Sequence, residues 1–246
     1  MNLSAIVKPC QLNTYQQGKV FCQFDANKVV KISPQLFDAK YWQQKNAIIG
    51  SAQGRGTTWF IKTEGQEWVL RHYYRGGLIG KLINDSYLYQ GMAKTRAAQE
   101  FNLLAQMQKL ALPAPQAIAY QVIRHGLFYR ADLITQRIEN AIDLVELLTQ
   151  KSLDSALWEA IGKTIKSFHQ HGIYHHDLNA HNILIDDNKK VWLIDFDRGE
   201  QRTVASQWQE SNMQRLLRSF NKEKNKLPTF HWQPQHWQQL LKGYHL

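Results

Sequence analysis

Apolar side chains along the chain repeat with two different periods, and each period predicts a different kind of element. Around the Glu64-Gly65 pair, aromatic and β-branched residues fill Thr58–Thr63 and Glu67–Tyr73. Two such runs joined by a short turn that contains glycine predict a β-hairpin. Other strand-like segments, each short and rich in β-branched or aromatic residues, are residues 20–24, 28–32, 117–126 and 127–138. The first half of the chain is therefore expected to be rich in strands.

Two longer segments have the period of an amphipathic helix. Apolar residues recur every three or four positions in residues 93–110, which Pro113 follows, and in residues 155–170, after which Gly172 occupies the place of a capping glycine. This spacing puts the apolar side chains on one face of a helix. A shorter helix is predicted at residues 142–149.

The order of these elements predicts the fold class. Strands and one helix come first, a polar link follows at Glu139-Asn140, and the rest is mainly helical apart from a hairpin formed by the apolar runs 182–186 and 191–196. This order favours an α+β fold of two lobes with a cleft between them. We expect a strand-rich N-terminal lobe of residues 1–139 and a mainly helical C-terminal lobe of residues 140–246.

The net positive charge of the chain indicates which kinds of molecule it binds. Thirty Lys and Arg residues against twenty Asp and Glu give a net charge of +10. This excess indicates an anionic partner, which could be a nucleic acid, a phosphorylated substrate or a membrane surface. The two cysteines, Cys10 and Cys22, favour a reducing compartment. No signal-peptide layout and no apolar run of about eighteen residues are present, so we expect a cytosolic protein that can still contact a membrane.

The candidate chemistry lies in the sequence HHDLNAHN, residues 175–182, and in the hairpin that follows it. Asn182 precedes the first strand of that hairpin and Asp195 ends the second, so both side chains are expected to face one point. An amide oxygen and a carboxylate suit Mg²⁺, which keeps several waters and also binds substrate phosphates. Asp177, nearby in the loop, is placed to accept the proton of an attacking hydroxyl.

A zinc site is the alternative for this loop, because five histidines lie close together in the sequence. They are His169, His171, His175, His176 and His181. Their spacing matches no common zinc motif and no cysteine joins them. The Asp and Asn residues are therefore the stronger candidates for the chemistry.

These residues resemble the signatures of protein-kinase-like phosphotransferases. HHDLNAHN is similar to H-R-D-L-x-x-x-N, and DFD, residues 195–197, is similar to D-F-G. The resemblance implies ATP and Mg²⁺ as cofactors, Asp177 as the catalytic residue, Asn182 and Asp195 as metal ligands, and His175 as a residue that orients the loop. His176 stands where many kinases have a regulatory arginine. Asp197 in place of glycine and the absence of A-P-E indicate a small-molecule acceptor.

The resemblance also implies nucleotide-binding residues in the first half. Gly54 and Gly56 resemble a degenerate glycine-rich loop, although an ordinary hairpin turn would explain them too. Arg71 stands where most kinases have a lysine on their third strand. Glu100 is its expected partner, by analogy with the kinase Lys–Glu ion pair. The alternative for Glu100 is a helix residue that faces solvent.

Further segments resemble one family, the 3-deoxy-D-manno-octulosonic acid (Kdo) kinases of Gram-negative lipopolysaccharide assembly, which are relatives of the core heptose kinases. They are RHYYRGG (71–77), LIGKL (78–82), LPAP (112–115) and LIDFDRG (193–199). The family implies ATP-dependent phosphorylation of a Kdo hydroxyl, the 4-hydroxyl, on Kdo-lipid A. It also implies a peripheral position at the cytoplasmic face of the inner membrane, an anionic membrane surface as a partner and no nucleic acid. Arg75 and Lys81 are candidates for acceptor binding, with a strand end and turn as the alternative.

Two other classes of function remain open from the sequence. One is a phosphotransferase that acts on heptose, on another small molecule or on a protein. The other is a pseudokinase-like module that binds anionic lipid or nucleic acid. The complete set of Asp177, Asn182 and Asp195 argues against it, while the arginine at position 71 and the sparse glycine loop keep it open. The tryptophans of the C-terminal segment, residues 230–246, are expected to pack into the helical lobe, with a membrane-interface role as the alternative.

Overall fold

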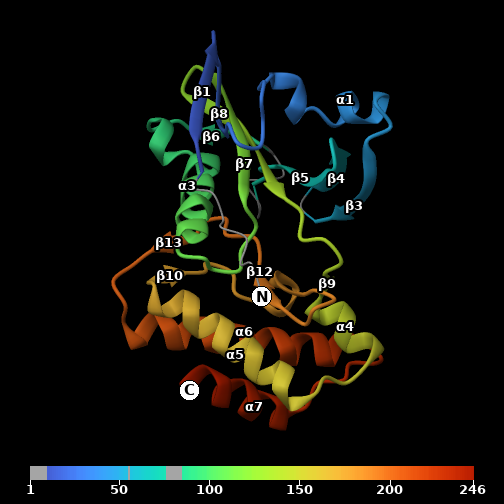
Figure 1. The fold of residues 1–246 in the computed structure, drawn as a ribbon. Coiled ribbons are helices and arrows are strands. Elements are labelled where there is room, and N and C mark those ends of the chain that lie inside the picture. The colour runs from blue at the N-terminus through green and yellow to red at the C-terminus, as the bar shows by residue number, and fades with distance from the viewer. Residues whose placement is uncertain (1–9, 55, 76–84) are drawn as a thin grey trace, which may run out of the picture. The chain divides into compact units, whose positions relative to one another are not determined.

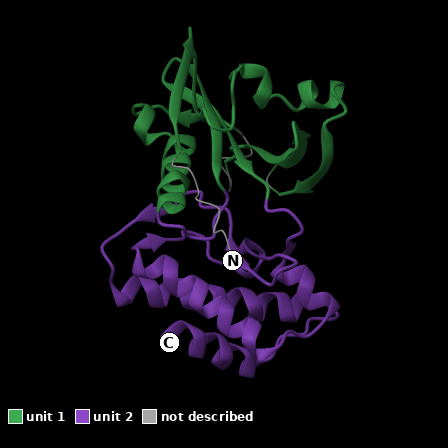
Figure 2. Cartoon of the chain, viewed as in Figure 1, with its two compact units in different colours: residues 1–109, 116–137 green, residues 110–115, 138–246 purple. Residues whose placement is uncertain are grey.

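The computed structural model describes residues 10–54, 56–75 and 85–246. The chain divides into two compact units, residues 1–109 with 116–137 and residues 110–115 with 138–246 (Figure 2). The first is built on an antiparallel sheet and the second consists mainly of helices (Figure 1). The predicted α+β class is confirmed.

The sheet of the first unit carries its strands in the order β1-β2-β7-β8-β5-β4-β3, and β6 pairs with β8. Every neighbouring pair is antiparallel. The strands are β1 (Leu12–Gln17), β2 (Val20–Asp25), β3 (Ile48–Gln53), β4 (Thr57–Thr63), β5 (Gln66–His72), β6 (Tyr87–Leu88), β7 (Ala117–His125) and β8 (Phe128–Gln136). The predicted β4–β5 hairpin is confirmed, and Glu64 and Gly65 in its turn both have the positive φ that such two-residue turns require.

Helix α3 (Arg96–Lys109) packs on this sheet through its apolar face. Phe101 is fully buried, and the centre of its ring lies 5.2 Å from that of Tyr120 on β7. A second core cluster joins the sheet to a segment that contains the 3₁₀ turn η1 (Pro34–Phe37) and helix α1 (Ala39–Gln44). In this cluster the rings of Trp42 and Trp68 pack edge to face, with their centres 5.9 Å apart. Both faces of the sheet therefore have buried partners in the first unit.

The prediction of a strand at residues 28–32 is wrong. Asp25 turns the chain there, because its side-chain oxygen accepts hydrogen bonds from the backbone N–H groups of Gln11 and Asn27, each at 3.0 Å. Val29 is buried in the core while Val30 is 97% exposed. The apolar residues of this segment thus serve as single anchors of an irregular loop.

The second unit is built from four helices and short strands. The helices are α4 (Leu144–Gln150), α5 (Ser155–Gln170), α6 (Ser206–Lys226) and α7 (Pro234–His245). The strands are β9 (Ile142–Asp143), β10 (Ile173–Tyr174), β11 (Ile183–Ile185), β12 (Val191–Leu193) and β13 (Glu200–Gln201). The predicted helix at 155–170 and the hairpin β11–β12 are confirmed. Helices α5 and α7 approach closely at Gly162, where a Cβ atom would collide with the carbonyl oxygen of Leu240.

The C-terminal aromatic residues pack inside the second unit. Trp232 is buried and its ring stacks on Phe220 of α6 at 5.6 Å, and Trp237 of α7 lies against the same phenylalanine. The expectation that these tryptophans pack into the helical part is confirmed. Within the described ranges, no helix has the length and apolar character needed to cross a membrane.

Candidate active site

The predicted site residues are divided between the two units, and each set is described within its own unit. In the second unit, the loop 175–182 is fixed by His175, which is buried. The Nε2 atom of His175 lies 2.9 Å from the carbonyl oxygen of Ile194, and its Nδ1 accepts the backbone N–H of Asp177 at 3.2 Å. Burial lowers the pKa of this imidazole, so the ring is neutral with its proton on Nε2. The prediction that His175 orients the loop is confirmed.

Asn182 closes the loop in the 3₁₀ turn η3 (Ala180–Asn182) and is nearly buried. Its Nδ2 donates to the carbonyl oxygen of Asp177 at 2.9 Å. This hydrogen bond fixes the orientation of the amide. Among the described residues, none donates a hydrogen bond to its Oδ1. Oδ1 of Asn182, the atom that would bind a metal ion, is therefore not used by the hydrogen bonds of the loop.

Asp195 reaches the same neighbourhood through the hairpin. The backbone N–H of Ile194 donates to the carbonyl oxygen of Asn182 at 3.0 Å, which places the residues before and after the hairpin side by side. Asp195 is exposed and has a φ of 60°, a left-handed conformation that is rare outside glycine and often marks a functional site. The next residue, Phe196, is fully buried between Phe168 and His175. This anchor holds the strained residue in place.

The donor set of Asn182 and Asp195 fits Mg²⁺. Both side chains offer hard oxygen atoms, and two protein ligands leave room for water and phosphate oxygens, as magnesium prefers. No group of three or more His, Cys, Asp or Glu side chains in the described part of the chain has the arrangement of a metal site. Among these residues, the clustered histidines therefore do not form a zinc site.

Asp177, the predicted catalytic residue, is accessible. Its side chain is 51% exposed, and its Oδ1 lies 3.3 Å from Nη1 of Arg215 on α6. Its backbone carbonyl accepts from both Asn179 and Asn182. The backbone of Asp177 is thus fixed while its carboxylate stays open to an acceptor.

In the first unit, the predicted pair of Arg71 and Glu100 is present. Nη2 of Arg71 on β5 lies 2.5 Å from Oε1 of Glu100 on α3, and the glutamate side chain is only 2% exposed. The hydroxyl of Tyr73 donates to Oε2 of Glu100 at 2.6 Å. Burial raises the pKa of Tyr73 well above its usual value, so the phenol remains a donor. The alternative of a solvent-facing Glu100 is wrong.

Gly54 and Gly56 lie in the turn between β3 and β4, where the N–H of Gly54 donates to the carbonyl oxygen of Gly56 at 3.0 Å. A Cβ atom on Gly56 would collide with the ring of Tyr74, whereas one on Gly54 would meet only a carbonyl oxygen at 3.8 Å. A side chain at position 56 would therefore require the ring of Tyr74 to move. No such packing constraint applies at position 54.

Of the two residues predicted to bind the acceptor substrate, the structure describes Arg75 but not Lys81. The guanidinium of Arg75 lies over the ring of Tyr87, 5.1 Å from its centre, and Arg96 stacks on the same ring. Lys81 and the segment Leu78–Leu82 lie outside the described residues.

Sequence reasoning missed three residues outside the loop 175–182 that contact it. Arg215 on α6 contacts Asp177. Asp143 and Glu223 contact His181, with Oδ2 of Asp143 3.1 Å from Nδ1 and Oε1 of Glu223 3.8 Å from Nε2. Asp143 also caps α4, because its other oxygen accepts the N–H of Val145 at 2.7 Å. Their partners are far away in the sequence, so no local pattern could have revealed them.

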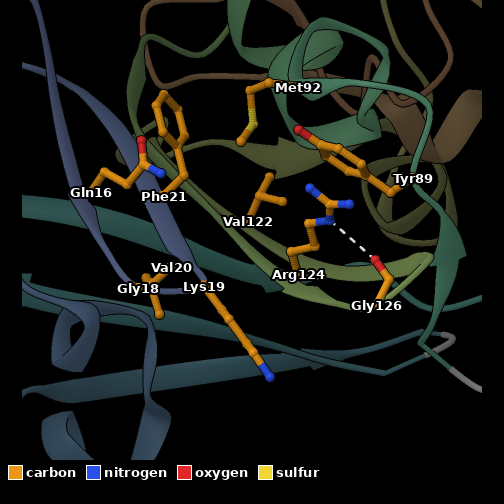
Figure 3. Close-up of a pocket in the computed structure, with 10 residues that line it drawn as sticks. All are labelled: Gln16, Gly18, Lys19, Val20, Phe21, Tyr89, Met92, Val122, Arg124 and Gly126. Carbon is orange, nitrogen blue, oxygen red and sulfur yellow. Dashed lines mark hydrogen bonds between the residues drawn. The ribbon is translucent and has the colours of Figure 1, made fainter.

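A cavity of about 390 Å³ in the first unit is lined by none of the predicted site residues (Figure 3). It lies beside β1, β2 and the β7–β8 turn. Arg124 covers the ring of Tyr89, 4.7 Å from its centre, and its Nε donates to the carbonyl oxygen of Gly126. Lys19 extends from the adjacent turn. This cavity is separate from the residues to which the motifs assign chemistry.

Comparisons with known proteins agree with the motifs. The model of the lipopolysaccharide kinase (Kdo/WaaP) family matches residues 39–244. The chain is 47% identical over 223 residues to a protein of Photobacterium profundum named 3-deoxy-D-manno-octulosonic acid kinase, covering 91% of this chain and 94% of that protein. Proteins of the same name from Vibrio parahaemolyticus and Haemophilus influenzae are 45% and 40% identical, over 86% and 88% of this chain and 89% and 92% of theirs.

Proposed function

The chain belongs to the lipopolysaccharide kinase (Kdo/WaaP) family, and from this premise we propose that it is an ATP-dependent sugar kinase that phosphorylates a hydroxyl of Kdo. The acceptor is Kdo-lipid A, the reaction belongs to lipopolysaccharide core biosynthesis, and the family implies the 4-hydroxyl. The observation that carries the proposal is the identity of 40% to 47% with relatives named for this activity over most of both chains. Acceptors such as heptose or a protein, and a binding module without activity, are not favoured.

Asp177 is the proposed base. The acceptor hydroxyl oxygen bonds to the γ-phosphorus of ATP, the bond to the β,γ-bridging oxygen breaks, ADP leaves, and the hydroxyl proton passes to the Asp177 carboxylate. The accessible carboxylate on a fixed backbone supports this role. Asn182 and Asp195 would hold Mg²⁺, which supplies positive charge to the phosphate oxygens when bound.

Arg71 is the proposed anchor for the nucleotide phosphates, on the pattern of the kinase lysine. Nη2 of Arg71 contacts Glu100, and the Arg71 side chain is 25% exposed. The planar guanidinium is always charged, and its geometry matches phosphate oxygens as well as carboxylates. We assign Gly54 and Gly56 to the loop that approaches the nucleotide.

The proposed location is the cytoplasmic face of the inner membrane, with an anionic lipid surface as partner. A surface on the first unit supports this, and we call it the hairpin tip: Leu88, Leu127, Phe128, Arg124 and Arg130. Leu88, Leu127 and Phe128 are 52%, 71% and 43% exposed, and Leu88 pairs directly with Phe128 across β6 and β8. Exposed apolar residues flanked by arginines are typical of a surface that enters the membrane interface.

Labelled ATP and a matched pair of acceptors test the proposed function. The protein is expected to transfer phosphate to Kdo-lipid A and not to the same lipid precursor without Kdo. Equal transfer to both acceptors would contradict the assignment of Kdo as the phosphorylated sugar. Transfer to neither would contradict the proposed activity.

A further inference from the structure

Arg215 on α6 makes an ion pair with the proposed base. Its Nη1 lies 3.3 Å from Oδ1 of Asp177, and the two side chains are 44% and 51% exposed. A solvent-exposed ion pair of this length is weak, because water competes for both charges. Arg215 can therefore exchange Asp177 for another anion that approaches the loop.

Two further arginines surround the same place. Burial lowers the pKa of His176, next to Asp177, and the charges of Arg198, Arg215 and Arg202 lower it further, while Asp177 acts in the opposite sense. The geometry agrees for two of these arginines: Arg215 contacts Asp177, and Arg202 lies over the ring of Tyr174, whose centre is 6.3 Å from that of His176. The result is a positive surface beside the base, which we call the arginine cluster: Arg198, Arg202 and Arg215.

The members of the arginine cluster differ in their partners. Arg202 lies over the ring of Tyr174, 3.5 Å from its centre, and is paired with Glu200. Arg198 is exposed, and no carboxylate of the described residues forms a salt bridge with it. Arg215 is thus the cation in contact with Asp177 that an incoming anion can engage.

We propose that Arg215 binds the carboxylate of the sugar acid whose hydroxyl is phosphorylated. This inference rests on the proposed function. In a 3-deoxy-octulosonic acid, the carboxylate is attached to C2 of the ring and the accepting hydroxyl to C4, so both groups are on one small ring. A hydroxyl placed on Asp177 brings the carboxylate close to the arginine that contacts Asp177. The planar guanidinium matches a carboxylate through two parallel hydrogen bonds.

This arrangement couples acceptor recognition to the base. When the acceptor carboxylate takes Asp177's place at Arg215, the Asp177 carboxylate is released to accept the hydroxyl proton. A neutral sugar leaves the Arg215–Asp177 pair intact, and its hydroxyl then competes with the guanidinium for Asp177. The arginine cluster therefore selects against acceptors without a carboxylate.

Steady-state kinetics of Arg215→Gln with Kdo-lipid A test the proposal. We expect a rise of about tenfold or more in the KM for the acceptor, with the KM for ATP unchanged, and partial recovery in Arg215→Lys. The matched control is Lys163→Gln, which removes one positive charge from an exposed position of α5 and should leave both KM values unchanged. Thermal unfolding of each variant shows whether it is folded. An unchanged acceptor KM in folded Arg215→Gln would overturn the proposal.

Two altered acceptors identify the anion that Arg215 binds. With a dephosphorylated lipid precursor that retains Kdo, the penalty of Arg215→Gln should be the same as with the phosphorylated acceptor. With the Kdo carboxylate converted to an amide, wild type and Arg215→Gln should perform equally. Loss of the penalty on the dephosphorylated acceptor would instead assign the anion to a lipid phosphate and overturn the proposal. A wild-type protein inactive on every acceptor would contradict the proposed function itself.

Discussion

At the scale of single residues, each histidine near the candidate loop has a different partner. His175 fixes the loop through Ile194 and Asp177, and His169 is buried with Nδ1 2.7 Å from the hydroxyl of Tyr244. Burial lowers the pKa of His169 to about 4, so this ring stays neutral near neutral pH. His175 therefore supports the loop, and the groups proposed for the chemistry are carboxylate and amide oxygens.

Asp177→Asn tests the proposed base. The substitution keeps the size of the side chain and removes its ability to accept a proton, so kcat should fall by about 10²- to 10⁴-fold. Because the proposed partner of Asp177 is the acceptor hydroxyl, the affinity for ATP should change little. Rapid-mixing assays of phosphate transfer and calorimetric titration with ATP measure the two quantities. A variant with wild-type kcat would remove Asp177 from the mechanism.

The two glycines of the β3–β4 turn should respond differently to alanine. Gly56→Ala places a methyl group against the ring of Tyr74 and should cost about 1–3 kcal/mol of unfolding free energy. Gly54→Ala meets no close atom and should change stability by less than about 1 kcal/mol. Urea denaturation of both variants gives the comparison, and an equal loss would contradict the packing seen at Gly56.

At the scale of elements, periodicity in the sequence predicted helices α3, α4 and α5 and the β4–β5 and β11–β12 hairpins, but not helices α1, α6 and α7. The β4–β5 and β11–β12 hairpins are local, because their strands and turns are adjacent in the sequence. Helix α6, in contrast, comes after the candidate loop and supports it through Asn212 and Ser219, which bond to the backbone N–H groups of His175 and Ala180. Such contacts depend on tertiary packing, so the spacing of motifs could not predict them.

In the candidate site, too, residues joined by local structure were predictable and residues brought in by tertiary packing were not. The proximity of Asn182 to Asp195, with Asp177 in the adjoining loop, was predictable because a short hairpin joins the two segments. The contact of Arg71 with Glu100 was predictable from the order of the kinase-like motifs. The roles of these residues remain predictions. Arg215 was not predictable, since 38 residues separate it from Asp177 and nothing in its neighbours marks it.

The contact of η3 with α4 should depend on pH. Hydrogen bonding to Asp143 raises the pKa of His181, and burial opposes it. The stabilisation is therefore complete below the unfolded pKa of about 6.5 and is lost as pH rises through the higher folded value. His181→Gln should lower the melting temperature at about pH 5.5 and have little effect at about pH 9. Because the side chain is 50% exposed, the loss should stay below about 1 kcal/mol. A loss that is larger at high pH would contradict this sign.

At the scale of the whole molecule, the net charge of +10 suits an acceptor and a membrane surface that are both anionic. The hairpin tip supplies exposed apolar residues and arginines in the first unit, and Arg215 supplies positive charge beside Asp177 in the second.

Vesicle binding tests the hairpin tip in the full chain. The double change Leu127→Ser and Phe128→Ser should weaken binding to vesicles that contain anionic lipid by roughly tenfold or more, because two apolar side chains no longer enter the interface. The matched control is Val30→Ser, which changes an apolar residue 97% exposed outside the tip. Equal effects of the tip and control variants would show that the tip has no special part in binding.

The most direct test of the central claim is mass spectrometry of Kdo-lipid A after incubation with the protein, ATP and Mg²⁺. The account predicts a mass increase of one phosphate, a fragment that places the phosphate on Kdo, and near-complete loss of this product with Asp177→Asn. A phosphate on the lipid part, or no added phosphate with folded wild-type protein, would contradict it.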